Sequence, residues 1–147
     1  MKISNETGTT AKIVGEQKTI ELFAKAGFTA WDFSLYDRNR YLFSENKVLG
    51  PDGKVIATDL IKFAKEMKQV GLDNGIVCNQ SHAPFPSNRP EIQDSFKKVI
   101  EMTAEAGGKI CVIHPWNNYS AEENAEMYVK LLPFAKACGV KIATENM

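Results

Sequence analysis

The chain has two histidines, and both stand where short apolar runs end, as does one acidic residue near the end of the sequence. They are His82, His114 and Glu145. Imidazole nitrogens and a carboxylate that converge on one point can bind a divalent metal ion or act as a general acid and base. Each residue alone has an ordinary explanation, since a strand-end histidine often makes only structural hydrogen bonds and Glu145 could be a solvated side chain. The shared position of all three favours one catalytic site.

Three further residues stand beside these positions and are candidates for substrate binding. Asp32 ends an earlier apolar run, while Phe85 and Trp116 shortly follow the two histidines. An aromatic ring can stack on the apolar face of a sugar, but either ring could equally form part of the wall of an active-site mouth. Asp32, Phe85 and Trp116 are therefore predicted to contact a small-molecule substrate.

The segment over residues 36–55 is long for a connection between a strand and a helix, and it is rich in polar residues. Long loops at the catalytic face of α/β proteins often act as lids or bind substrate. Arg38 or Arg40 could bind a phosphate or a carboxylate there, although solvated loop residues are the simpler interpretation.

Segments with helical periodicity alternate with strand-like apolar runs, which predicts a repeated strand–helix unit. Pro90 stands at a favoured first helical position, and Ser120 begins a capping-box pattern. A glycine is expected to end each helix, at positions 27, 71, 107 and 139. The helices are expected over about residues 13–26, 58–70, 90–106 and 120–138, and the strands over 2–5, 28–35, 75–81, 109–114 and 140–145.

This order predicts a parallel α/β architecture, for which the pattern leaves two arrangements open. One is an open, flavodoxin-like sheet. The other is an incomplete parallel (β/α)8 barrel, in which residues 1–147 supply about five strands and four helices as the N-terminal portion of a single domain. Adjacent strands lie ~4.8 Å apart, so strands in sequence order would place His82, His114 and Glu145 within an arc of about 10 Å.

The composition is that of an ordinary soluble protein, with 44% hydrophobic and 24% charged residues. Eighteen basic and eighteen acidic residues give a net charge of zero, so no nucleic-acid partner is expected. No apolar run approaches the ~20 residues of a membrane span, and the start of the chain has no signal-peptide pattern. The three cysteines lack ligand or disulfide spacing. A cytoplasmic location is expected.

The segments 81–85 (Ser-His-Ala-Pro-Phe) and 113–116 (Ile-His-Pro-Trp), together with a strand that ends in Glu145-Asn146, resemble the xylose isomerase-like TIM-barrel superfamily. The segment 26–32 (Ala-Gly-Phe-Thr-Ala-Trp-Asp) resembles the junction before the second strand of that family. The superfamily includes sugar phosphate isomerases and epimerases as well as apurinic endonucleases. The resemblance spans nearly the whole chain and favours the barrel over the open sheet.

The resemblance implies that Glu145 binds one divalent metal ion, manganese first, with zinc, magnesium or cobalt as alternatives. The remaining ligands of the family are expected beyond Met147. Glu145 would also exchange a proton with a carbon beside the substrate carbonyl, while the metal polarises its oxygens. The positions of His82 and His114 face the site in the sugar enzymes and bind zinc in the endonucleases.

The expected function is therefore a metal-dependent isomerase or epimerase that acts on a small sugar or sugar phosphate. An apurinic-endonuclease-like phosphodiesterase and a non-catalytic flavodoxin-like binding module are the alternatives. With the far wall of the site missing, the 147-residue chain is expected to be inactive and to bind metal weakly. An exposed edge strand and exposed helix faces favour a homo-oligomer.

Overall fold

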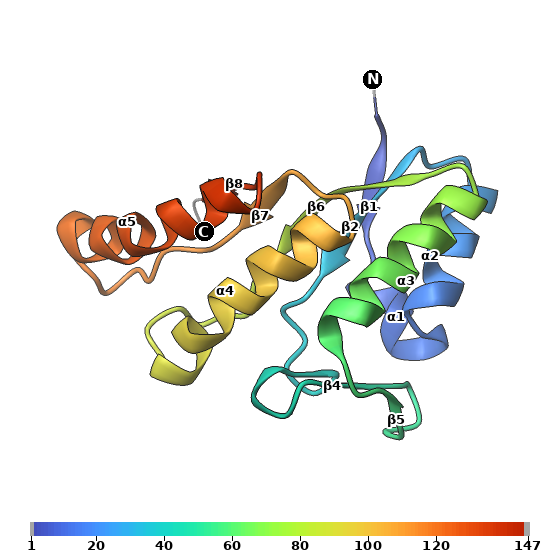
Figure 1. Ribbon diagram of the computed structural model, residues 1–147, viewed down its shortest axis with the longest axis horizontal. Coiled ribbons are helices and arrows are strands. Elements are labelled where there is room, and N and C mark those ends of the chain that lie inside the picture. Colours follow the sequence, from blue (N-terminus) through green and yellow to red (C-terminus); the bar gives the residue numbers. More distant parts are fainter. Residues whose placement is uncertain (1, 146–147) are drawn as a thin grey trace.

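A five-stranded parallel sheet forms the centre of the computed structural model, which describes residues 2–145 (Figure 1). Its strands are β1 (Ser4–Glu6), β2 (Ala30–Ser34), β6 (Val77–His82), β7 (Ile110–Val112) and β8 (Lys141–Ala143). They lie side by side in sequence order, and every neighbouring pair is parallel. This order excludes the flavodoxin-like alternative, because a doubly wound sheet reverses its strand order at a switch point.

Five α-helices lie within residues 2–145, where the sequence predicted four, and the four longer ones pack against the strands of this sheet. The five helices are α1 (Gly8–Val14), α2 (Glu16–Lys25), α3 (Leu60–Asp73), α4 (Pro90–Glu105) and α5 (Ala121–Ala137). The helix expected over residues 13–26 corresponds to α2, which begins only at Glu16 because Gly15, with a φ of 83°, separates it from α1, and α1 was not predicted. A positive φ ends the helical hydrogen-bond ladder and is accessible to glycine at little cost. No helix within residues 2–145 is both long and apolar enough to cross a membrane.

The end of α3 also differs from the prediction. The helix continues through Gly71 to Asp73, and Gly75, with a φ of 76°, makes the turn into β6. A Cβ at Gly71 would lie 2.9 Å from the carbonyl oxygen of Ile76 and 3.0 Å from the indole nitrogen of Trp31. Gly71 therefore allows the close approach of α3 to the sheet, and it does not end the helix as predicted.

The starts of α4 and α5 follow the predicted signals. Pro90 is the first residue of α4. At α5, the Ser120 hydroxyl accepts a hydrogen bond from the backbone N–H of Glu123, whose carboxylate accepts one from the backbone N–H of Ser120. Both hydrogen bonds of a capping box are thus present, and they satisfy amide groups that the first helical turn leaves free.

The segment over residues 36–55 is not a loop throughout, because it contains most of a small antiparallel sheet, drawn in teal in Figure 1. Its strands are β3 (Tyr41–Leu42), β4 (Lys47–Leu49) and β5 (Val55–Ala57), with a 3₁₀ helix η1 (Phe43–Glu45) between the first two. Arg40 is not a solvated loop residue, because it is only 5% exposed and its Nη1 lies 3.3 Å from Oε2 of the buried Glu16. The Tyr41 hydroxyl donates to the same oxygen at 3.0 Å. This buried contact ties the small sheet to the start of α2.

The two faces of the main sheet differ in polarity. Alternate side chains of a strand point to opposite faces. Trp31 and Phe33 of β2 are buried in the apolar core, with ring centroids 5.0 Å apart. Asp32 and Ser34, between and beyond them, belong to the opposite face, where polar residues gather toward the carboxyl ends of the strands. That face positions the candidate site.

Candidate functional site

Strand register brings three of the predicted site residues to one end of the sheet. His82 is the last residue of β6 and pairs with Val112 of β7, which in turn pairs with Ala143 of β8. His114 and Glu145 each lie two residues beyond this paired level, so both return to the same face of the sheet. The three side chains therefore converge from adjacent parallel strands.

The convergence is close enough for one metal ion. One ligand atom from each of His82, His114 and Glu145 lies within 4.8 Å of the others. Oε2 of Glu145 lies 3.6 Å from Nε2 of His82 and 3.9 Å from Nε2 of His114. The two imidazole rings stack at 5.9 Å between centroids, with an angle of 28° between their planes. The structure thus unites these three residues, and their catalytic and metal-binding roles remain predictions.

Asp32 lies behind His82 and does not line the cavity that faces Glu145. Its Oδ1 is 3.1 Å from Nδ1 of His82, and Gln80 donates to its Oδ2 at 2.7 Å. A proton on Nδ1 of His82 would be held by Asp32, and the Nε2 lone pair would then face Glu145. Such a carboxylate–histidine pair is the usual way in which a metal-binding imidazole is oriented. The geometry therefore makes Asp32 a positioning residue for His82.

The contact with Asp32 also changes the acidity of His82. The hydrogen bond to Asp32 raises the pKa of His82, burial of the ring opposes this effect, and the charges of Asp32 and Glu145 add to the increase. Because the folded state holds this proton more tightly than the unfolded chain does, the pair stabilises the fold below the ordinary histidine pKa of ~6.5. That contribution is lost as the pH rises through the folded-state pKa.

We expect His82 to titrate above its ordinary value in the chain without added metal, and Asp32→Asn to lower its pKa. The reason is that asparagine keeps a similar shape but removes the negative charge that favours the imidazolium form. Proton NMR of the two histidine rings as a function of pH measures this directly. Circular dichroism of the variant verifies that the fold is intact. An unchanged His82 titration curve in a folded Asp32→Asn chain would contradict the assigned contact.

The two predicted aromatic residues lie beside His114. The Phe85 ring meets the His114 ring edge-on, with centroids 6.0 Å apart and an interplanar angle of 82°. Trp116 packs against Phe85 at 5.6 Å and does not itself line the cavity. Nδ1 of His114 is buried and has no hydrogen-bond partner among the described residues. Phe85 therefore forms an apolar wall of the site, and Trp116 supports it.

The strand ends enclose a hollow of about 310 Å³. It is lined by Glu6, Tyr36, His82, Ala83, Phe85, His114 and Glu145. Neither Glu6 nor Tyr36 was predicted from the sequence as a site residue. The first strand was expected to end at residue 5, whereas β1 continues to Glu6, which is the strand-end residue that the same reasoning would have selected. No local pattern marks Tyr36, because it follows β2 in a segment that was interpreted as a loop.

Comparison with known proteins gives the fold but no close relative. The sequence matches no protein-family model and no curated protein. Among solved structures, a D-tagatose 3-epimerase-like protein is similar at a TM-score of 0.66 and 20% identity, over 100% of this chain and 53% of the other. A sugar phosphate isomerase/epimerase from Parabacteroides distasonis gives 0.62 and 20%, over 97% and 50%. The IolI protein with a binding zinc atom gives 0.63 and 22%, over 98% and 51%.

The chain has the fold of a partial (β/α)8 barrel. It spans about half the length of the proteins that it matches. The resemblance to the xylose isomerase-like barrels, which rested on short motifs around the histidines and Glu145, is thus confirmed at the level of the fold.

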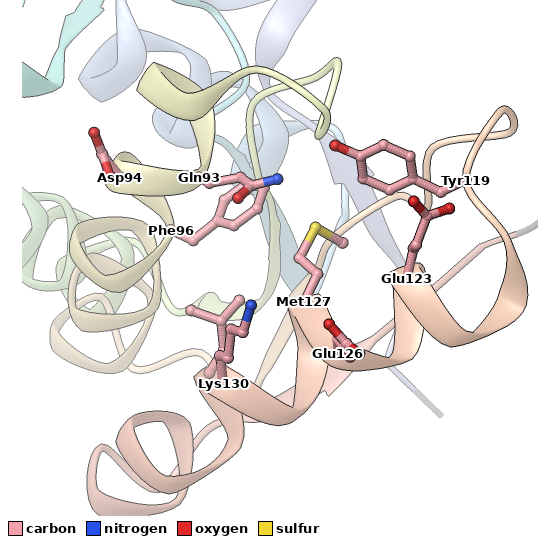
Figure 2. A pocket seen from close by; sticks show the side chains of 9 residues that line it. Gln93, Asp94, Phe96, Tyr119, Glu123, Glu126, Met127 and Lys130 are labelled. Atoms are coloured by element: carbon pink, nitrogen blue, oxygen red, sulfur yellow. The ribbon is translucent and has the colours of Figure 1, made fainter.

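A second hollow lies in the helical layer of the partial barrel, between α4 and α5 (Figure 2). It measures about 360 Å³ and shares no lining residue with the hollow at the strand ends. Phe96 and Met127 form an apolar floor, with Glu123, Glu126 and Lys130 around it. Its lining includes the carboxylates of Asp94, Glu123 and Glu126 but neither histidine nor cysteine, and these carboxylates form no cluster that could hold a metal ion among the described residues.

Proposed function

We propose that this chain carries part of the active site of a metal-dependent isomerase or epimerase that acts on a small sugar or sugar phosphate. The observation that supports this most directly is the cluster of His82, His114 and Glu145 at the carboxyl ends of adjacent barrel strands. That end of a (β/α)8 barrel is where catalytic residues gather. The structural neighbours, which are named as sugar epimerases and isomerases, agree with this assignment.

The donor set fits a divalent transition metal. Two imidazole nitrogens and one carboxylate oxygen suit Zn²⁺, Mn²⁺ or Co²⁺ better than Mg²⁺, which prefers oxygen ligands alone. The neutral form of His82 that Asp32 orients has its Nε2 lone pair available, and Oε2 of Glu145 lies between both rings. We propose that these three atoms hold the metal, with manganese as the first candidate and zinc as the second.

The proposed reaction moves a proton at a carbon beside the substrate carbonyl, and the metal ion and the residues of the chain have different roles in it. A bound metal ion would supply the Lewis acidity that stabilises negative charge on the substrate oxygen. In our proposal, Glu145 is one half of an acid–base pair: its carboxylate takes the proton from the carbon beside the carbonyl, and the other group of the pair returns a proton to the substrate. Asp32 keeps His82 oriented, and Phe85 excludes water from one side of the reacting carbons.

A second candidate function competes with the sugar isomerase or epimerase, because two histidines and one glutamate also form a typical zinc site. An apurinic-endonuclease-like phosphodiesterase would use the same three residues to hold zinc against a phosphate. Its substrate is a polyanion, however, and the hollow presents the carboxylates of Glu6 and Glu145 without a lysine or arginine among its described lining residues. The charge of this cavity favours the sugar over the nucleic acid.

The test is a metal titration of the chain followed by NMR of the two histidine rings. Zn²⁺ should shift, and Mn²⁺ should broaden, the signals of His82 and His114 together, because both contact the same ion. D-fructose should then perturb the metal-loaded chain, and an oligonucleotide with an abasic site should not. A metal that leaves either histidine unchanged would contradict the assigned centre, and a response to the oligonucleotide alone would favour the phosphodiesterase.

A further inference from the structure

The hollow at the strand ends has a second polar wall, which the metal cluster does not use. Sheet order places β1 and β2 on one side of β6, and β7 and β8 on the other. Glu6 ends β1 and Tyr36 follows β2, so both line the side of the hollow opposite His114 and Glu145. A ligand that fills the hollow therefore contacts both walls.

Hydrogen bonds within the chain hold this second wall in place. Oε1 of Glu6 accepts a hydrogen bond from the Ser34 hydroxyl at 3.0 Å and another from the Tyr36 hydroxyl. The Ser34 oxygen accepts one from the backbone N–H of Gly8 at 2.8 Å, and the backbone N–H of Ser34 donates to the Thr7 hydroxyl at 3.2 Å. The hydrogen bonds that the described residues donate to the carboxylate of Glu6 both go to Oε1, which leaves Oε2 for a ligand.

The glycine at position 8 makes room for the pair of Glu6 and Tyr36. A Cβ at Gly8 would collide with the Tyr36 hydroxyl and would lie 2.7 Å from Oε1 of Glu6. Gly8 has no positive φ, so its backbone does not require glycine. The absence of a side chain there is explained by the close packing of the two polar groups.

The charge of the wall determines what it can bind. Glu6 offers a carboxylate oxygen as an acceptor, which suits a hydroxyl group and repels a phosphate. Burial and the hydrogen bond to Glu6 raise the pKa of Tyr36 well above its usual range, so the phenol stays protonated. Glu145 adds a second carboxylate, and no lysine or arginine is present among the described lining residues to balance them.

We propose that Glu6 and Tyr36 form a specificity-determining subsite that binds a hydroxyl-bearing, uncharged end of the sugar and disfavours a phosphate at that position. This inference rests on the proposed function and narrows its substrate class to unphosphorylated ketoses at this end. Oε2 of Glu6 accepts a hydrogen bond from a substrate hydroxyl, and the hydrogen bonds from Tyr36 and Ser34 keep the carboxylate in position.

The experiment compares D-fructose with fructose 6-phosphate as ligands of the Zn²⁺-loaded chain, by isothermal titration calorimetry or NMR. The original chain should prefer D-fructose. Glu6→Gln should weaken D-fructose binding by about tenfold, or about 1.4 kcal/mol, and reduce the preference, since a hydrogen bond to a neutral amide is weaker than one to a carboxylate. Tyr36→Phe should weaken it less, because the phenol acts through Glu6. Glu126→Gln and Tyr119→Phe, at the hollow between α4 and α5, are the matched controls and should bind as the original chain does.

The possible results distinguish a failure of the proposed subsite from a failure of the proposed metal centre. If Zn²⁺ binds to every variant and D-fructose affinity does not change in Glu6→Gln, the subsite is wrong and the metal centre stands. Binding of Zn²⁺ without binding of either sugar, or a preference for the phosphate, also overturns the subsite. If Zn²⁺ does not bind but D-fructose does, and depends on Glu6, the subsite stands without the proposed metal centre. Thermal unfolding of each variant verifies that the fold is retained.

Discussion

Replacing Glu145 by glutamine should weaken the binding of Zn²⁺ by about 100-fold, because even residues that only support a metal ligand change affinity by 10–100-fold when mutated. Among the described residues, Oε2 of Glu145 is the carboxylate atom with contacts to both Nε2 atoms, at 3.6 Å from His82 and 3.9 Å from His114. The variant would keep the size of the side chain but lose the charge that offsets the ion. Isothermal titration calorimetry of both chains measures the change.

The matched control is Glu126→Gln, which removes an exposed carboxylate from α5 and should leave the affinity for zinc unchanged. The affinity of the original chain should rise with pH through the pKa of His82, because the metal competes with the proton on that ring. Equal zinc affinities for Glu145→Gln and the original chain would show that the ion binds elsewhere, and the proposed function would lose its main support.

Arg40→Met should lower the free energy of unfolding by about 3–5 kcal/mol at pH 7, as is typical when one partner of a buried ion pair is removed. Glu16 is 1% exposed, and Arg40 supplies the cation that faces its carboxylate. The variant would leave Glu16 buried without a facing cation, so the folded state must either carry an unpaired charge or take up a proton, with the hydrogen bond from Tyr41 as partial compensation. Urea unfolding followed by circular dichroism gives the change in free energy.

The loss of unfolding free energy in Arg40→Met should depend on pH. Burial raises the pKa of Glu16 above its ordinary value even with Arg40 present, and the arginine opposes this increase. Without Arg40, the folded chain would hold the Glu16 proton still more tightly than the unfolded chain does. Stability of the variant should therefore fall as the pH rises above the ordinary glutamate pKa of ~4.3, so that Arg40→Met is closer to the original chain at pH 5 than at pH 7.

A double variant tests whether the pair stabilises the protein or only avoids an unpaired charge. Several polar atoms of the pair already lack partners among the described residues, namely Oε1 of Glu16 and Nε and Nη2 of Arg40. Replacing both residues, as Glu16→Leu with Arg40→Met, should therefore recover most of the stability that the single change loses. A double variant as unstable as Arg40→Met alone would contradict this explanation.

Local sequence signals predicted most of the fold. Apolar periodicity gave the alternation of strands and helices, and the capping residues Pro90 and Ser120 gave the starts of α4 and α5. The prediction failed where the backbone depends on a single glycine or on distant contacts. Gly15 separates the predicted helix from α1, which was not predicted, and the small sheet of β3–β5 is tied to α2 by the buried contacts of Arg40 and Tyr41 with Glu16.

For the site, the sequence by itself determined which end of each strand carries His82, His114 and Glu145, because the end of an apolar run is a local feature. Only the tertiary structure decided that Asp32 orients His82 and that Glu6 and Tyr36 share the cavity with the metal cluster. The physical reason is that these contacts join residues from different strands and depend on the order and register of the sheet. Register is set by packing and hydrogen bonding across the whole sheet, which no single segment encodes.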